Sequence, residues 1–197
     1  RGGGVATLVR RDVLPYETRD LGTDHAVATD FEYVRTMIRG VAVINVYAPP
    51  TTSLRGLDDL VGQTRSAHPG GEIVLCGDFN AAHDTWNHPN DPTKRCHMKK
   101  QRGEVLYDVM VKHGFVVANG GEPTTCNGSV LDLTLCTAGA LSDAHEVVPR
   151  LVSGVHYPVL YDLRTKMVEP GGKKVRRMRS IIPSGAEEGF CGALDNM

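Results

Sequence analysis

The sequence predicts an α/β fold built on a mixed sheet or sheets, and two observations carry this prediction. Short runs of β-branched and apolar residues alternate along the chain with stretches in which apolar residues recur at helical spacing. That alternation is typical of helices packed against a sheet. The chain has 197 residues, of which 41% are hydrophobic and 23% charged, a balance that favours one folded domain over a disordered chain.

Each expected strand is a short apolar or β-branched run that ends at turn-forming residues. The clearest covers 41–47 and stops before Pro49 and Pro50, because proline has no N–H to give to a ladder. Residues 72–76 form a short, mostly apolar run, as expected for a strand buried on both faces. Further strands are expected over 5–9, 31–38, 115–118, 130–136 and 157–163.

Two helices are expected, over 54–67 and 103–113, because apolar residues recur there at helical spacing. Gly114 follows the second helix at the position where a left-handed glycine often ends a helix. The segment 86–101 is rich in Asn, Pro, His and Lys, and it is predicted to be a loop.

The character of the chain changes after residue 163, where Lys and Arg become frequent. We therefore interpret residues 1–165 as one domain and residues 166–197 as a basic linker or tail, which could grip phosphates or simply be solvated. The chain opens with Arg1 and three glycines instead of a methionine, and we expect it to be part of a longer reading frame.

Composition excludes several classes of protein. The formal net charge is -1, so nucleic-acid binding would depend on a local basic patch. The five cysteines are odd in number and form no CxxC, which favours reduced thiols in an intracellular protein over a disulfide framework or a zinc module. No run approaches the ~18 apolar residues that a membrane span needs, so no membrane is expected as a partner.

The first candidate site is Gly77-Asp78-Phe79-Asn80, which directly follows the expected strand over 72–76. Ligand sites of α/β sheets lie beyond the carboxyl ends of the strands. An extended backbone would direct Asp78 and Asn80 to one side, as a carboxylate able to take a proton or bind a cation and an amide able to donate to a phosphate. The alternative is a turn in which both side chains bond their own backbone.

Asp132 and His156 form the second candidate site. Asp132 lies in the apolar run 130–135, where a buried carboxylate needs a partner; on an edge strand it would instead face water. His156 precedes the last expected strand and can act as a general base or a phosphate contact, whereas a lone histidine there would be structural. If the two lie side by side, the carboxylate would fix the imidazole tautomer and support its charge, as in a catalytic dyad.

Three further residues are candidates for substrate contact. Asn45 and Tyr47 share one face of the strand over 41–47, and the phenol at its end would either reach a phosphate or pack with its hydroxyl in water. Trp86, between His83 and His88, fits either a DNA-facing loop or a surface turn with the indole tucked into the core.

Taken in order, these segments resemble the exonuclease-endonuclease-phosphatase superfamily, which has the pancreatic-type deoxyribonuclease fold. The full residue sequences of these motifs are similar to those of the endonuclease domains of non-LTR retrotransposons, and in particular to trypanosomatid elements. The specificity of the resemblance comes from the joint order of the motifs over residues 3–163. The matching segments are Gly3 to Ala6, Asn45 to Pro50, Gly77 to His83 with Trp86, Gly121 to Thr124, Gly128 to Thr134 and His156 to Val159.

This resemblance implies a four-layer α/β sandwich, in which two mixed sheets lie face to face with helices outside. It also implies hydrolysis of a DNA phosphodiester with the help of Mg²⁺ or Mn²⁺, so that one strand is nicked and the new 3′-hydroxyl primes reverse transcription. The implied partners are DNA and a downstream reverse transcriptase domain of the same polyprotein. An intracellular, nuclear location follows from that role.

The resemblance also implies roles for the candidate residues. Asp78 would position or activate the attacking water, and Asn80 would hold the scissile phosphate. Asp132 would orient His156, which would stabilise the phosphate in the transition state. The residues expected to bind substrate are Tyr47, Asn45 and Trp86.

The chain departs from the family pattern in two places. The family opens with a strand bearing an Asn and a later strand ending in a metal-binding Glu; neither is found, so we expect a sandwich without its N-terminal edge and leave the metal ligands unassigned. Secondly, Val155 stands where the family's Ser-Asp-His motif has its acid. Because losing a catalytic group can cost orders of magnitude in rate, three functions stay open: an endonuclease, impaired in this chain; a catalytically dead remnant or non-enzymatic DNA-binding module; and a phosphatase of small phosphoesters.

Overall fold

The structure is a computed structural model that describes residues 5–9, 31–149 and 154–164. The predicted tail over 166–197 lies outside these residues. No helix in the described part of the chain is long and apolar enough to cross a membrane. The described elements are β1 (Glu32–Ile38), β2 (Val41–Tyr47), α1 (Leu57–Ala67), β3 (Glu72–Asp78), a short 3₁₀ helix η2 (Pro92–Arg95), α2 (His97–His113), β4 (Val116–Val117), β5 (Asp132–Cys136), β6 (Leu141–Val147) and β7 (Val159–Leu163).

The central sheet has five strands in the order β1-β2-β3-β5-β4. β1 and β2 form an antiparallel hairpin around Arg39 and Gly40, which both have positive φ. β2 and β3 run parallel, and α1 forms the crossover that a parallel pair requires. β5 pairs antiparallel with both β3 and β4, so the sheet is mixed, as predicted.

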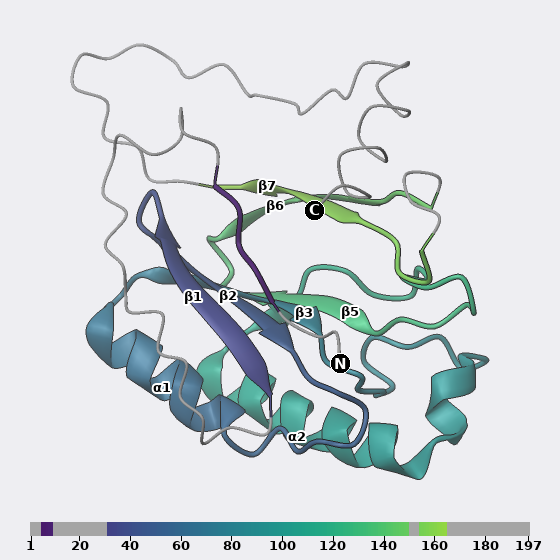
Figure 1. Cartoon of the computed structure of the whole chain (residues 1–197). Coiled ribbons are helices and arrows are strands. Elements are labelled where there is room, and N and C mark those ends of the chain that lie inside the picture. Colours follow the sequence, from purple (N-terminus) through teal and green to yellow (C-terminus); the bar gives the residue numbers. More distant parts are fainter. Residues whose placement is uncertain (1–4, 10–30, 150–153, 165–197) are drawn as a thin grey trace, which may run out of the picture.

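The described elements are arranged in three layers. Helices α1 and α2 lie along one face of the central sheet, and β6 and β7 form a two-stranded antiparallel sheet on the other side (Figure 1). The larger apolar core lies on the helix side of the sheet and includes Ile44, Leu57, Leu75 and Leu106. A smaller core joins the two sheets; its buried members are Val41, Val74, Cys136, Ala140 and Leu141. The predicted α/β class and the facing sheets are confirmed, with three of the four expected layers formed by described residues.

Two expected boundaries prove wrong. Residues 5–9 were expected to be a buried strand, but they form no ladder and Leu8 is 94% exposed. Asn45 Nδ2 ties this segment to β2 instead, by donating to the Ala6 carbonyl at 2.9 Å. The expected loop over 86–101 contains η2 and the beginning of α2. Strand β6 escaped prediction because its sequence, Leu-Ser-Asp-Ala-His-Glu-Val, lacks a run of apolar residues.

Other boundaries agree closely with the sequence pattern. β2 covers the residues expected, and α2 ends at Gly114, whose φ of 64° is left-handed and whose N–H bonds the last turn of the helix. The four cysteines in the described part of the chain are free. Burial raises the pKa of the Cys76 thiol to about 11, so this side chain is un-ionised at neutral pH.

Asp91 fixes the loop between β3 and α2 onto the chain that leads into β5. Its carboxylate is 5% exposed and accepts hydrogen bonds from Asn87 Nδ2, from the Thr93 N–H and hydroxyl, and from the Val130 N–H. Burial by itself would raise the pKa of Asp91, but these hydrogen bonds outweigh burial and the pKa is lowered. The loop is therefore held by a buried, ionised carboxylate, both oxygens of which accept hydrogen bonds.

Gly77 allows β3 to continue to its last residue, Asp78, while lying against β2. Its φ is 136°, a conformation that L side chains rarely adopt, and a Cβ there would lie 1.9 Å from the carbonyl oxygen of Val46. A comparable close approach occurs at Gly103, where α2 passes the backbone of Ala82 and a Cβ would lie 2.0 Å from its carbonyl oxygen. Both glycines are required by contact with neighbouring backbone.

Replacing Gly77 with alanine should lower the free energy of unfolding by at least about 2 kcal/mol, because the methyl group is strained at this φ and meets the Val46 backbone. Guanidinium denaturation of the full chain measures this difference. The matched control is Gly62→Ala in α1, where nothing lies within 4 Å of the added Cβ and alanine should be neutral or stabilise by about 1 kcal/mol. A Gly77→Ala variant as stable as the parent would contradict this account.

Candidate active site

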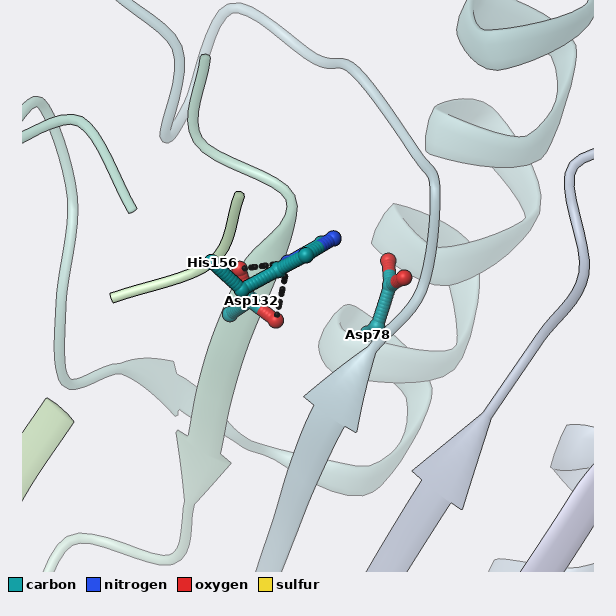
Figure 2. Close-up of side chains that lie close together, drawn as sticks. All are labelled: Asp78, Asp132 and His156. Atoms are coloured by element: carbon teal, nitrogen blue, oxygen red, sulfur yellow. Dashed lines mark hydrogen bonds and ion pairs between the residues drawn. The ribbon is translucent and has the colours of Figure 1, made fainter. Parts of the chain in front are cut away.

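Three strand ends meet at one edge of the central sheet. The parallel register of β2 and β3 sets Tyr47 level with Asp78, and the antiparallel register of β3 and β5 sets Asp78 opposite Asp132. His156, which precedes β7, completes the group. Asp78, Asp132 and His156 each offer a ligand atom within 4.8 Å of the others, and they are the one such group of His, Cys, Asp or Glu in the described part of the chain (Figure 2).

Asp132 and His156 form the pair that the sequence left open. His156 Nδ1 lies 2.9 Å from Asp132 Oδ2 and 3.1 Å from Oδ1. Because a carboxylate accepts, Nδ1 is the donor, and Nε2 is left for the site. Figure 2 shows the imidazole directed from Asp132 towards the space beside Asp78. Asp132 therefore does not simply face water, and His156 is not isolated.

The carboxyl group of Asp78 has an unusual electrostatic environment. Burial raises its pKa, and the negative charge of Asp132 raises the pKa further. The N–H of Asn80 and the positive charges of His156 and Lys99 lower it without cancelling the increase. A carboxylate with a raised pKa is a stronger proton acceptor than an ordinary aspartate, and two facing carboxylates also favour a cation between them.

Asn80 holds Asp78 in this geometry. It is 6% exposed and has a φ of 47°, and its N–H donates to Asp78 Oδ1 at 3.0 Å. Its side-chain amide donates to Asp78 Oδ2 at 3.0 Å and to the Ala48 carbonyl at 3.2 Å. The Asp78 side chain therefore bonds the local backbone, as in the alternative interpretation, whereas the Asn80 amide bonds the Asp78 carboxylate and the distant Ala48 carbonyl. A phosphate contact would have to take over one of the two amide hydrogens.

The three expected substrate contacts are placed differently. Tyr47 is half-buried at the end of β2, level with Asp78, and Asn45 lies two residues earlier with its amide on the Ala6 carbonyl. Trp86 is 1% exposed and its Nε1 donates to the Ala81 carbonyl at 3.4 Å. The expectation that Trp86 faces substrate is therefore wrong, because packing in the apolar core leaves no ring surface for a ligand.

Arg102 is a site-supporting residue that the sequence reasoning missed. It is 5% exposed, and its guanidinium donates to the carbonyl groups of Ala48, Pro49 and Phe79, which follow β2 and β3. Burial lowers the pKa of Arg102, and the nearby charge of Asp78 acts in the opposite direction. The available signal was an arginine at helical spacing from the apolar residue Leu106, which indicates that the guanidinium faces the core.

Asn119 was also missed, although it fixes the beginning of β5. It is 1% exposed; its Nδ2 donates to the Asp132 carbonyl at 2.8 Å, and its Oδ1 accepts from the Thr134 N–H at 2.7 Å. Both bonds replace ladder partners where β4 has ended. No periodicity distinguishes such an asparagine from an ordinary loop residue.

A local basic patch lies beside the site. The segment 92–103, which forms η2 and the first part of α2, contains five Lys or Arg residues and no acid. Arg102 is buried against backbone carbonyls, so the patch consists of the other four. Lys99 lies near enough to lower the pKa of Asp78, whereas Lys94 is paired with Asp84. From the sequence we expected the basic region in the tail, which lies outside the described residues. The structure shows a second basic region, over 92–103, next to the candidate site.

The three clustered side chains fit a divalent cation. Asp78 and Asp132 supply the carboxylate oxygens that Mg²⁺ and Mn²⁺ prefer, and a cation would relieve the repulsion that raises the pKa of Asp78. Val155, at the position of the acid in the family motif, is 54% exposed and contributes no ligand. The ligand set is therefore sparse for a hard cation, which ordinarily completes its shell with water or substrate oxygens.

Comparison with solved structures shows the fold. The endonuclease domain of TRAS1, a telomere-specific non-LTR retrotransposon, matches with a TM-score of 0.53 and 22% identity over 70% of this chain and 63% of that one. The 3′ phosphatase NExo from Neisseria, bound to a product DNA hairpin, gives 0.50 and 22% over 67% and 64%. An AP endonuclease from Archaeoglobus fulgidus gives 0.50 and 20% over 66% and 64%. The chain thus spans a little under two thirds of the length of each.

Sequence comparison shows the family. A search of curated proteins finds no significant match. The family model described as "Endonuclease-reverse transcriptase" matches residues 41–160, which is more than half of the chain and includes all three clustered side chains. With the fold and the family model in agreement, the chain belongs to the endonuclease-reverse transcriptase family of the exonuclease-endonuclease-phosphatase superfamily.

Proposed function

We propose that this chain is a divalent-metal-dependent endonuclease domain that nicks DNA for retrotransposition. The observation that carries the proposal is the Asp132–His156 pair facing Asp78 at the edge of the sheet. A carboxylate of raised pKa beside an oriented imidazole can divide the work of phosphodiester hydrolysis, because one group handles the water and the other the phosphate.

Asp78 is the group proposed to handle the attacking water. Once ionised, its carboxylate can orient the water and accept its proton as the oxygen attacks phosphorus. The P–O3′ bond breaks, the departing O3′ takes a proton from solvent, and the products are a 3′-hydroxyl and a 5′-phosphate. Asn80 orients this carboxylate through its backbone N–H and its amide. Arg102 fixes the backbone on which both residues stand, by binding the carbonyls of Ala48 and Phe79.

His156 is proposed to act on the phosphate through Nε2. Its Nδ1–H is bound to Asp132, which sets the tautomer and supports a positive charge on the ring. A protonated imidazole beside the phosphate would stabilise the charge that develops on its oxygens. Tyr47, level with Asp78 at the end of β2, is the phenol proposed to contact the same phosphate.

Asp78 and Asp132 are the residues proposed to hold Mg²⁺ or Mn²⁺. When bound, such a cation acts as a Lewis acid that offsets charge on the phosphate. The sparse ligand set, without an acid at Val155, favours weak binding, so an impaired enzyme is part of this proposal.

The proposed substrate is DNA, and the basic patch over 92–103 is the proposed track for its backbone. The match of a family model that joins endonuclease and reverse transcriptase supports a polyprotein in which such a polymerase follows. An enzyme that nicks chromosomal DNA would act in the nucleus. The rival proposal, a catalytically dead DNA-binding remnant, rests on the sparse ligand set and predicts binding without cleavage.

The first experiment is nicking of supercoiled plasmid by the full chain, with Mg²⁺ and with chelator. Asp78→Asn and His156→Asn should each lower the Mg²⁺-dependent rate by about 10²–10⁴-fold, because each removes a group that moves or stabilises charge. Asp162→Asn, an exposed site in β7, is the matched control and should nick like the parent. No nicking by the folded parent would favour the remnant, and release of inorganic phosphate from a small phosphoester would favour a phosphatase.

The pH dependence of the free energy of unfolding should report the charge of Asp78 without a nicking assay. Because folding raises the pKa of Asp78, its ionised form destabilises the protein at any pH above the folded-state pKa, and this penalty disappears below the ordinary value of 3.8. Metal-free Asp78→Asn should therefore gain stability relative to the parent as the pH rises from acid to neutral, as measured by urea denaturation at both pH values. Mg²⁺ should stabilise the parent more than the variant. A stability difference that does not change between acid and neutral pH would contradict the proposed electrostatics, because the hydrogen bond that asparagine loses from Asn80 costs the variant stability at every pH.

DNA binding should depend on Lys99. Lys99→Ala should lower the slope of log K against log salt concentration by about 1, as expected when one phosphate contact is lost. Fluorescence anisotropy with a short duplex and Asp78→Asn protein measures this without cleavage. The matched control is Lys112→Ala at the other end of α2, where the ammonium is paired with Asp58. Equal slopes for Lys99→Ala and the parent would remove Lys99 from the DNA-binding surface.

A further inference from the structure

Thr124 lies between the two segments that carry the Asp132–His156 pair. Asp132 begins β5 in the central sheet, whereas His156 leads into β7 in the two-stranded sheet. The pair therefore bridges two separate hydrogen-bonded sheets. Thr124 is fully buried in the loop before β5.

The side chain of Thr124 holds the Asp132 segment. Its Oγ1 accepts hydrogen bonds from the backbone N–H groups of Leu131 and Asp132, both at 3.1 Å. Two donors on consecutive residues converge on one hydroxyl oxygen, which fixes the direction in which the chain enters β5. Any rotation of this peptide would turn the Asp132 side chain and move the acceptor of His156.

The backbone around Thr124 holds the His156 segment. The Thr124 carbonyl accepts from the Tyr157 N–H at 2.8 Å, and the Cys126 N–H donates to the Val155 carbonyl at 2.8 Å. Thr125 and His156 are thus paired in an isolated antiparallel bridge. One residue, Thr124, consequently bonds the backbone of Asp132 with its side chain and the neighbour of His156 with its carbonyl.

We infer that Thr124 is a positioning residue for the Asp132–His156 pair, and this inference rests on the proposed function of that pair. The hydroxyl oxygen keeps Asp132 at the distance from which it bonds Nδ1 of His156. Valine has nearly the shape of threonine but no acceptor, so it would leave two buried N–H groups without a partner. Serine keeps the acceptor and loses only a methyl group.

Thr125 provides a matched control in the same turn. It is 3% exposed, and its hydroxyl donates to the Ser129 carbonyl at 3.2 Å and accepts from the Ser129 N–H at 3.1 Å. Its hydroxyl stabilises the loop but does not bond the Asp132 segment. Thr125→Val therefore measures the effect of loosening the turn, and Thr124→Val measures that effect together with the loss of the Asp132 support.

The experiment compares Thr124→Val, Thr124→Ser and Thr125→Val in the full chain, with two readouts. The first is kcat and KM for nicking of a short duplex with Mg²⁺. The second is the tautomer of His156 in metal-free protein above the range where histidine protonates, read from ¹⁵N-edited imidazole spectra assigned with His156→Asn. The pairing with Asp132 selects the Nδ1–H form, whereas an unsupported imidazole shifts towards the Nε2–H form.

We expect Thr124→Val to lower kcat by about 10- to 100-fold with KM nearly unchanged, the scale of a small misplacement of catalytic groups, and to shift His156 towards Nε2–H. Thr124→Ser should restore both readouts close to those of the parent, and Thr125→Val should keep both. If Thr124→Val does not fold, Thr124→Ala takes its place with the same expected results.

Retention of the parent tautomer in the folded Thr124 variant would overturn the inference, as would equal loss of kcat in the Thr124 and Thr125 variants. The tautomer is read without metal or DNA, so it decides the inference even if the parent does not nick. In that case a tautomer shift confined to the Thr124 variant would support the positioning role while the endonuclease proposal failed separately.

Discussion

Two carboxylates that face each other across adjacent strands set the main physical constraint in this molecule. The antiparallel register of β3 and β5 makes Asp78 and Asp132 partners, so their charges cannot move apart without changing the sheet. The consequence is the raised pKa of Asp78, to which both burial and the charge of Asp132 contribute. The neighbouring groups offset this repulsion by hydrogen bonding: His156 donates its Nδ1–H to Asp132, and the N–H and amide of Asn80 donate to Asp78.

The surroundings of the site are fixed by buried polar groups with many partners. Arg102 binds three carbonyl groups next to Asp78. Asp91 accepts four hydrogen bonds, one of them from the chain that leads into β5. Asn119 hydrogen-bonds the backbone on both sides of Leu133. Each is nearly inaccessible to water, so each would be costly without its partners. The irregular loops around the site are therefore fixed by the hydrogen bonds of these buried polar groups.

Much of the fold was predictable because its signal is local. The β-branched run 41–47 formed β2 as expected, and Gly114 ended α2 in the left-handed conformation its position required. The motif residues Asp78, Asp132 and His156 meet as the resemblance implied. Prediction failed where a tertiary contact overrides local pattern. Trp86 was expected to contact substrate, yet its ring is buried in the core, which was the alternative for this segment.

The hydrogen-bond partners of the residues that support the site could not be predicted for the same reason. Arg102 bonds carbonyls that lie 53 and 54 positions earlier in the sequence, and no spacing rule connects residues so far apart. The role of the Asn80 side chain depended on whether the backbone at 78–80 stayed extended; its positive φ decided for the turn.

The division of the Asp132–His156 pair between two sheets has a consequence for the lifetime of the site. A two-stranded sheet is marginally stable by itself, so β6 and β7 depend on the small core they share with the central sheet. Partial opening of that layer, together with loss of the two backbone hydrogen bonds that join the His156 segment to the Thr124 turn, would carry His156 away while β3 and β5 stayed folded. The fraction of molecules with an assembled site is thus set by a sub-global opening equilibrium, whose free energy is smaller than that of global unfolding.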